Sequence, residues 1–147
     1  MGLFDKVFSS NAAQTNPFTD SRDAFFAILY ACMSADGNVD DEEINALVAV
    51  SQQKAFFRGY DIVSIYRRIA PKVIALGNVL EAVTQAAPQI PVELRETLFA
   101  TCVDFAAADG MVGRAEQSVL EHLQQALELD SQRCLTIIDV ILVKNKG

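Results

Sequence analysis

Long apolar runs are absent from this sequence, and so are the features of a secretory signal. No run approaches the roughly 20 apolar residues that a membrane-spanning helix needs, and no basic segment precedes an apolar run with a cleavage motif. Basic residues are also scarce, with 12 Lys and Arg against 19 Asp and Glu and a net charge of −7. Nucleic acid phosphates bind clusters of positive charge and repel such a surface. We therefore expect a cytoplasmic protein that has no transmembrane segment and does not bind nucleic acid.

Side chains that commonly carry catalysis or bind zinc are few. The sequence contains one histidine, His122, and three cysteines, Cys32, Cys102 and Cys134, without a Cys-x-x-Cys pair. An odd number of cysteines in apolar, helix-forming surroundings favours reduced core thiols over disulfides or zinc ligands. Burial raises the pKa of a thiol and lowers its reactivity, and no nucleophile lies beside a base in the sequence. We therefore predict that the protein is not an enzyme.

Helix-forming segments make up most of the chain. Its 147 residues suffice for one domain with a sizeable core, and 51 % of them are hydrophobic. From about Ser21 onward, apolar residues recur at intervals of three and four, which is the spacing of an α-helix. Glycine and proline separate the segments. We predict an all-α, single-domain bundle over residues 20–147, preceded by an N-terminal segment and linker over residues 1–19.

The N-terminal segment has a pattern of its own. Its first eight residues, MGLFDKVF, place Leu3, Phe4, Val7 and Phe8 at helical spacing. Such a segment could form a short amphipathic helix that docks on the body of the protein or frays, or one that anchors weakly to a membrane or a partner. The stretch SSNAAQTNPFT that follows has the polar composition of a linker. These alternatives stay open at the level of the sequence.

One short pattern occurs twice. The stretch SADGNVDDEE begins at Ser34, and AADGMVGRAE begins at Ala107, in the second half of the chain. Both contain Ala-Asp-Gly, one residue, Val, three residues and Glu, and flanking residues such as Phe26 and Phe99 match at the same offset. Two copies of one helix pair predict a bundle with an internal pseudo-two-fold repeat. The central helices of the two copies are expected to pack together, with residues 58–90 connecting the halves.

Helix-end geometry explains most of this motif. Gly37 can adopt the left-handed conformation that ends a helix. Asp40 can cap the next helix and form a capping box with Glu43. In the second copy Gly113 is a poorer cap, again three residues before Glu116. On this interpretation the protein is a metal-free helical scaffold whose acidic residues are helix caps.

The aspartates before the turn glycines, Asp36 and Asp109, need a further explanation. An aspartate in the last turn of a helix opposes the helix dipole, so backbone N–H groups or a cation should offset it. The pattern also reproduces the second half of a calcium-binding EF-hand loop. The first half does not match, because Cys32 and Ser34 lie where calcium ligands should be. We therefore reject a true EF-hand and keep an open oxygen site for a divalent cation as the second interpretation.

The duplicated motif in an all-helical chain resembles the TerB-like tellurite-resistance family. The resemblance rests on SADGNVDDEE and AADGMVGRAE and covers roughly residues 20–145. It implies an all-α fold of about seven helices, a bacterial cytoplasmic location, and association with stress and tellurite resistance without a reaction on tellurite. It also implies a protein partner among the membrane-associated components of that system, and hence a place at the membrane periphery.

The resemblance further implies that acidic residues at the two turns bind a divalent cation such as Ca²⁺. The residues that match are Asp36, Asp40, Glu43, Asp109 and Glu116. The second copy departs from the pattern at Gly113 and Arg114, and the arginine places positive charge beside any ion. The leading hypothesis is a non-enzymatic, cation-binding protein-interaction module, and the metal-free scaffold is its alternative.

Overall fold

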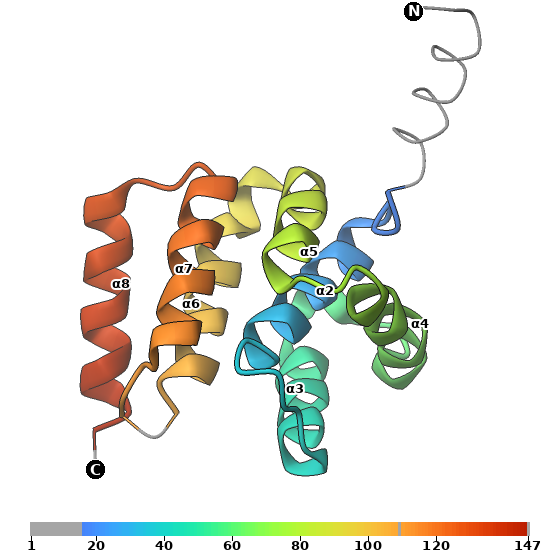
Figure 1. Ribbon diagram of the computed structural model, residues 1–147, viewed down its shortest axis with the longest axis horizontal. Coiled ribbons are helices and arrows are strands. Elements are labelled where there is room, and N and C mark those ends of the chain that lie inside the picture. Colours follow the sequence, from blue (N-terminus) through green and yellow to red (C-terminus); the bar gives the residue numbers. More distant parts are fainter. Residues whose placement is uncertain (1–15, 109, 147) are drawn as a thin grey trace, which may run out of the picture.

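The computed structural model describes residues 16–108 and 110–146, and all regular structure within these ranges is helical (Figure 1). The α-helices are α2 (Ser21–Met33), α3 (Asp41–Gln53), α4 (Ile62–Ala75), α5 (Val79–Ala86), α6 (Arg95–Ala106), α7 (Arg114–Ala126) and α8 (Ser131–Lys144). Three short 3-10 helices join them: η1 (Ala55–Phe57), η2 (Ala87–Gln89) and η3 (Val92–Leu94). The predicted all-α class is confirmed. The amphipathic pattern of residues 1–8 and the side chain of Asp109 lie outside the described residues.

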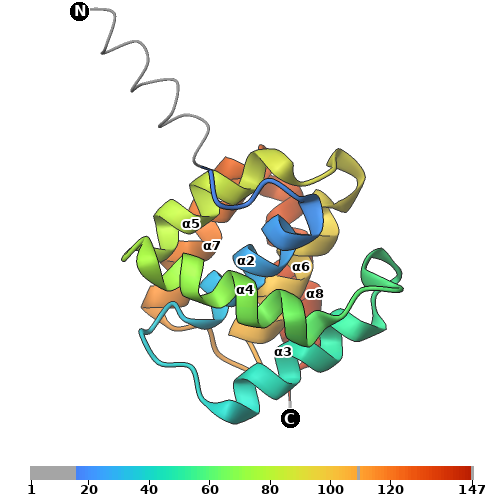
Figure 2. The same cartoon turned by 90° about the vertical axis from the view of Figure 1, so that its right-hand side faces the viewer.

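Helix α2 lies at the centre of the bundle. Every residue from Ala24 to Met33 is buried, because α2 packs against α3, α4, α5, α6 and α7. Figure 2 shows α2 near the middle with the other helices around it. Its sequence is apolar on all sides, and such a helix is stable only when it is covered on all sides. Asp20 begins the helix by accepting hydrogen bonds from the backbone N–H groups of Arg22 and Asp23.

The pairs α2–α3 and α6–α7 follow the repeat in the sequence. The offset that separates the two motifs also separates the first and last residues of α3 from those of α7, and the last residue of α2 from that of α6. Helices α2 and α6 pack together, as expected for the central helices of the two copies. The segment between the pairs contains α4 and α5. The order of helices and turns therefore repeats along the chain at the spacing of the sequence motif.

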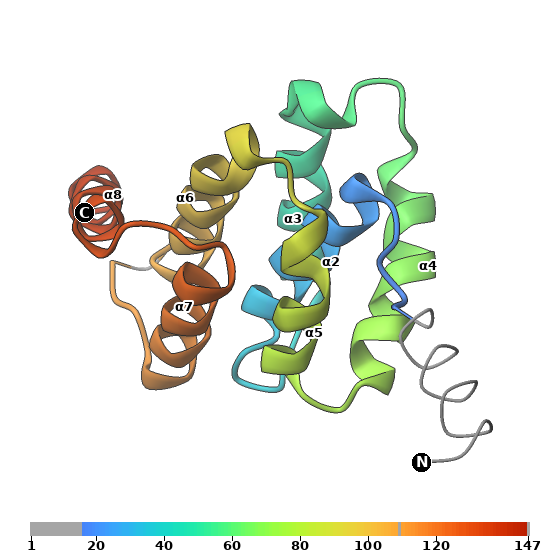
Figure 3. The same ribbon diagram turned by 90° about the horizontal axis from the view of Figure 1, so that it is seen from above.

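The surroundings of the two pairs differ. Helices α4 and α5 cover α2, whereas α8 packs on α6, and Figure 3 shows α4 and α8 at opposite ends of the molecule. The end of α8 is fixed to α6 through Asp104, which accepts hydrogen bonds from Asn145 Nδ2 at 2.8 Å and Lys144 Nζ at 3.2 Å. Within residues 16–108 and 110–146, no helix has the length and apolar character needed to span a bilayer.

Candidate acidic site between the two repeats

The first motif forms a tight turn between α2 and α3. Gly37 has φ of 86°, and its N–H donates to the carbonyl of Ser34 at 2.9 Å. Asp36 Oδ1 accepts a hydrogen bond from the backbone N–H of Asn38 at 3.0 Å. Helix α2 ends at Met33, so the expectation that Asp36 lies in the last helical turn is wrong, and Asp36 lies in the turn that follows. The backbone N–H of Asn38 engages one of its two carboxylate oxygens.

A capping box begins α3. Asp40 Oδ1 accepts from the backbone N–H of Glu43 at 2.8 Å, and Glu43 Oε1 accepts from the backbone N–H of Asp40 at 3.3 Å. This arrangement confirms the predicted capping box. Asp40 is exposed and Glu43 is half-buried. Each of these hydrogen bonds also uses one oxygen of a carboxylate.

The second motif repeats the backbone of the first and changes the cap. Gly110 has φ of 88°, and its N–H donates to the carbonyl of Ala107 at 2.9 Å. Gly113 stands at the N-cap of α7 and forms no side-chain cap. The Glu116 carboxylate folds back over it, so that a Cβ built on Gly113 would lie 2.5 Å from Glu116 Oε2. Glu116 thus fills the space in which a capping side chain would lie.

Both motifs contribute to one pocket of about 280 Å³. Its acidic residues are Asp36, Asp40, Glu42 and Glu43 from the first motif and Glu116 from α7. Its other lining residues come from the ends of α2 and α6 and the first turns of α3: Cys32, Met33, Ala46, Phe105, Ala106 and Ala108. The structure therefore brings together four of the five predicted ligand residues, from turns that are far apart in the sequence.

The pocket also contains residues that the sequence reasoning missed. Glu42 is not among the predicted ligands, although it lies within the acidic run DDEE. Met33 and Phe105 line the apolar side of the pocket. They occupy the last turns of α2 and α6, and only the packing of these two helices places them beside the acids.

The pocket has the chemical groups that a hard cation prefers, but its side chains are not arranged around an ion. Carboxylate oxygens are the ligands that Ca²⁺ prefers in proteins. In the part of the chain that is described, however, no three acidic, histidine or cysteine side chains lie close enough together to hold an ion. Asp40 and Glu43 instead point toward each other's backbone in the capping box. An ion at this site therefore requires the acidic side chains to rotate their free oxygens toward it.

The cysteines are buried and reduced, as predicted. Burial, followed by the hydrogen-bonding contact with the Cys32 thiol, raises the pKa of Cys102 well above its ordinary value. Burial is also the main reason that the pKa of Cys134 is raised, with Asp130 adding to it. Thiols with raised pKa values form little thiolate at neutral pH and are poor nucleophiles.

His122 also has a structural contact. Its Nε2 lies 2.7 Å from Thr84 Oγ1, and this contact joins α7 to α5. The residue does not line the acidic pocket. A catalytic role for the imidazole at the acidic turns therefore has no geometric support.

The fold and the pocket define the class of protein. It is an all-helical bundle with two helix pairs, and an acidic motif marks the turn within each pair. A family model described as "Tellurite resistance protein TerB" matches residues 22–137, a range that includes both turns. The chain belongs to the TerB family, and it is a tellurite-resistance-associated protein. No curated protein and no solved structure matches the chain significantly.

Proposed function

We propose that the protein is a non-enzymatic binding module of the tellurite-resistance response and that its acidic pocket binds a divalent cation such as Ca²⁺. The supporting observation is that acids of the first motif and Glu116 of the second, at the start of α7, line one pocket. Helix capping alone does not require the two turns to meet. The proposed ligand residues are Asp36, Asp40, Glu43, Asp109 and Glu116.

Electrostatics gives a reason for the binding. Carboxylates held within one pocket repel each other, and a cation relieves this repulsion. The hydrogen bonds of Asp36, Asp40 and Glu43 each engage one oxygen, so the second oxygen can turn toward an ion without loss of the turn. Since the site is open and its side chains must rotate, we expect weak affinity, with Kd on the order of 10⁻⁴ to 10⁻³ M, which is the weak end of the range for calcium-binding loops.

The output that we propose is a protein contact. Acids at this pocket lie beside the apolar side chains of Met33 and Phe105. A combined acidic and apolar surface suits a partner segment with basic and apolar residues. On the family resemblance, the partner belongs to the membrane-associated components of tellurite resistance, and the protein works in the cytoplasm at the membrane periphery.

The metal-free scaffold is the second candidate. It is favoured by the complete capping box of Asp40 and Glu43, and by the spacing of the acids, which in the described ranges leaves no ready cluster of three. In this case the pocket contributes only helix caps and a negative surface.

Calorimetric titration with Ca²⁺, Mg²⁺ and Mn²⁺ separates the two candidates. The variant D36N/E43Q keeps a side-chain carbonyl at both positions, so the turn and the capping box retain their acceptors. It removes two negative charges, and the cation hypothesis therefore predicts lost binding with little change in melting temperature. The control E93Q/D139N removes the same charge at exposed positions outside the pocket and should bind like the wild type. A wild-type protein with no heat of binding and no stabilisation at millimolar cation supports the scaffold.

A further inference from the structure

Positive charge in this acidic protein gathers around α4. Residues 54–80 contain five of the 12 Lys and Arg residues but only one of the 19 Asp and Glu residues, Asp61. Helix α4 itself contains no Asp or Glu. Four of the five basic side chains are exposed: Arg58, Arg67, Arg68 and Lys72. The surface around α4 is therefore mainly positive, whereas the turn between α2 and α3 is acidic.

Apolar side chains lie among these positive charges. Four exposed residues of α4 recur at intervals of three and four and so form one stripe on its outer side: Val63, Arg67, Pro71 and Ile74. Ile74 is 66 % exposed and Val63 is 39 % exposed. Tyr60, just before the helix, is also exposed, and the Arg22 guanidinium lies 4.1 Å from the centre of its ring. We call the stripe, together with Arg68 and Lys72 beside it, the α4 face.

The acids next to the α4 face are already engaged. Asp61 caps α4 by accepting from the backbone N–H of Ser64 at 3.3 Å and from its hydroxyl at 2.8 Å, and the positive end of the helix dipole lies beside it. Asp23 of α2 pairs with Arg68. Lys72 Nζ donates to the carbonyl of Pro17 at 3.5 Å, which is a neutral group. The α4 face therefore keeps a positive charge.

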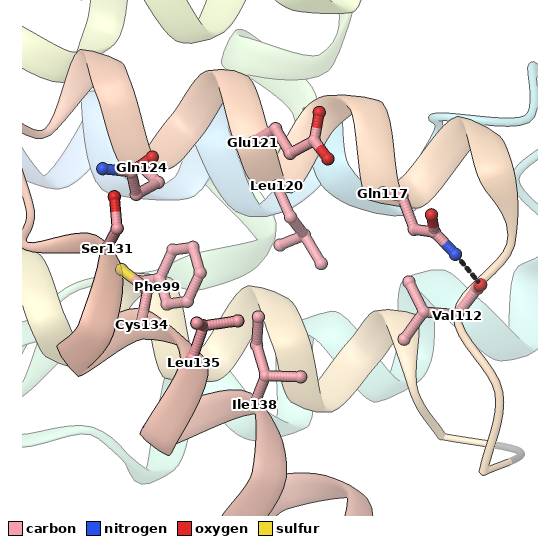
Figure 4. Close-up of a pocket in the computed structure, with 10 residues that line it drawn as sticks. All are labelled: Phe99, Val112, Gln117, Leu120, Glu121, Gln124, Ser131, Cys134, Leu135 and Ile138. Carbon is pink, nitrogen blue, oxygen red and sulfur yellow. Dashed lines mark hydrogen bonds between the residues drawn. The ribbon is translucent and has the colours of Figure 1, made fainter.

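The α4 face lies on the outside of the bundle. Figure 2 shows α4 across the near side of the molecule, in front of α2. Besides the acidic pocket, the protein has a cavity of about 260 Å³ between α7 and α8 (Figure 4), and no residue of α4 lines either of them. Peptide segments are commonly bound in grooves or at sheet edges, whereas an outward helix face with basic and apolar side chains suits the surface of a bilayer.

We propose that the α4 face binds the surface of a membrane that contains anionic phospholipids. Arg67, Arg68 and Lys72 would face the lipid head groups, and Ile74 would reach the boundary of the acyl chains. Each Lys or Arg held near an anionic bilayer raises the affinity about fivefold. The acids on distant parts of the molecule oppose this little, because charges are screened beyond roughly 8 Å at physiological salt. This proposal does not depend on cation binding by the acidic pocket.

Sedimentation with lipid vesicles tests the proposal. The full-length protein is mixed with vesicles of equal parts phosphatidylserine and phosphatidylcholine, or of phosphatidylcholine alone, in the presence of a chelator. We expect binding to the anionic vesicles that weakens as salt is added, and no binding to phosphatidylcholine. Because the chelator removes divalent cations, the acidic pocket does not affect the result. Absence of binding to the anionic vesicles overturns the proposal.

Substitutions show whether the α4 face carries the binding. R67Q/K72Q removes two positive charges from it, and R114Q/K146Q removes the same charge at exposed positions on α7 and after α8. We expect R67Q/K72Q to weaken binding to the anionic vesicles roughly 25-fold, and R114Q/K146Q to bind like the wild type. Equal weakening in both variants would mean that binding follows net charge alone, which contradicts a docking face on α4.

A fluorescent probe shows which side of the protein meets the lipid. The chain contains no tryptophan, so a single introduced indole reports on its own surroundings. I74W places it on the α4 face, and V143W is a matched control on α8, where Val143 is 75 % exposed. We expect anionic vesicles to shift the emission of I74W to shorter wavelengths and to leave that of V143W unchanged. A shift in V143W in place of I74W overturns the proposal.

An acidic protein is the other kind of partner that a basic surface could take. Soluble polyglutamate, tested in the same buffer, represents it. Binding to polyglutamate without binding to the anionic vesicles would assign the α4 face to an acidic protein and overturn the membrane proposal.

Discussion

The turn between α2 and α3 and the turn between α6 and α7 bend the chain in the same way, with Gly37 and Gly110 at φ of 86° and 88°. Their side chains differ. Asp40 caps α3 with a carboxylate, whereas Gly113 at the equivalent position has no side chain and is covered by Glu116. The comparison distinguishes the residues that the backbone bend requires from those that it does not. The glycines are needed for the bend in both turns, while the acids that the bend does not need are concentrated in the first.

The largest effects are expected where the repeat places equivalent aromatic residues in the core. Phe26 and Phe99 are 0 % and 1 % exposed and occupy matching positions. We expect F26A and F99A each to lower the free energy of unfolding by about 3–5 kcal/mol, with F26A the more damaging. Phe26 lies in the most enclosed helix and meets Tyr66 at a centroid distance of 6.4 Å, whereas Phe99 lines the cavity between α7 and α8. Urea denaturation measures both, and a much smaller loss in F26A would contradict the central place of α2.

The turn glycines should respond alike. A Cβ at Gly37 meets no atom within 4 Å, and one at Gly110 meets only the carbonyl oxygen of Asn145 at 3.9 Å. Because neither site is crowded, the cost of G37A and G110A comes from the left-handed backbone, roughly 1–2 kcal/mol each. Denaturation of the two variants side by side checks this. A clear difference between them would show that the two turns are not equivalent.

Stability should fall in alkaline solution, and more through Cys102 than through Cys134. Both thiols have raised pKa values in the folded protein, so the unfolded chain releases their protons first. The stabilising contribution is therefore complete below the ordinary thiol pKa of about 8.5 and is lost as the pH rises above it, by up to roughly 1.4 kcal/mol per pH unit for each thiol. Denaturation between pH 7 and 10 should show a shallower pH slope in C102A than in C134A, because Cys102 is completely buried. Equal slopes would count against this explanation.

The smallest effects are expected at the caps. D40A removes the side-chain cap of α3 and should cost about 1 kcal/mol, whereas D40G, which copies the second turn, should cost only a few tenths. G113S should stabilise α7 by a few tenths of a kcal/mol, and G113D by less, because its carboxylate would meet that of Glu116. Thermal unfolding at neutral pH measures these differences. A larger gain from G113D than from G113S would mean that Glu116 does not hold the cap position.

The sequence predicted the fold better than the pocket because helices and turns are encoded locally. Apolar spacing predicted helices from about Ser21 onward, and the Asp-Gly motif predicted both turns and the capping box of Asp40 and Glu43. The expectation that proline separates the helical segments is wrong at Pro71, which lies inside α4. For Asp36 the sequence allows either a cation or backbone N–H groups as the partner, and the structure shows the N–H of Asn38. Ligand assignment at the five acidic positions stays a prediction.

Features that depend on how helices pack could not be read from the sequence. Met33 and Phe105 lie beside the acids only because α2 and α6 end at the same place in the bundle. The cavity between α7 and α8 likewise depends on the way α8 packs on α6. Leu120 is buried whereas Leu135 is exposed, although both lie at apolar helical spacing. Periodicity identifies the apolar face of a helix but does not show which part of that face remains open.

Calcium titration of E116Q by calorimetry tests most directly whether the two repeats build one cation site. Glu116 belongs to the second motif and lies at the start of α7, far in sequence from Asp36 and Glu43, yet it lines the same pocket. We predict that E116Q weakens Ca²⁺ binding, although the first turn is intact. Wild-type affinity in E116Q, with binding lost only in D36N/E43Q, would contradict a shared site and confine the cation to the first turn.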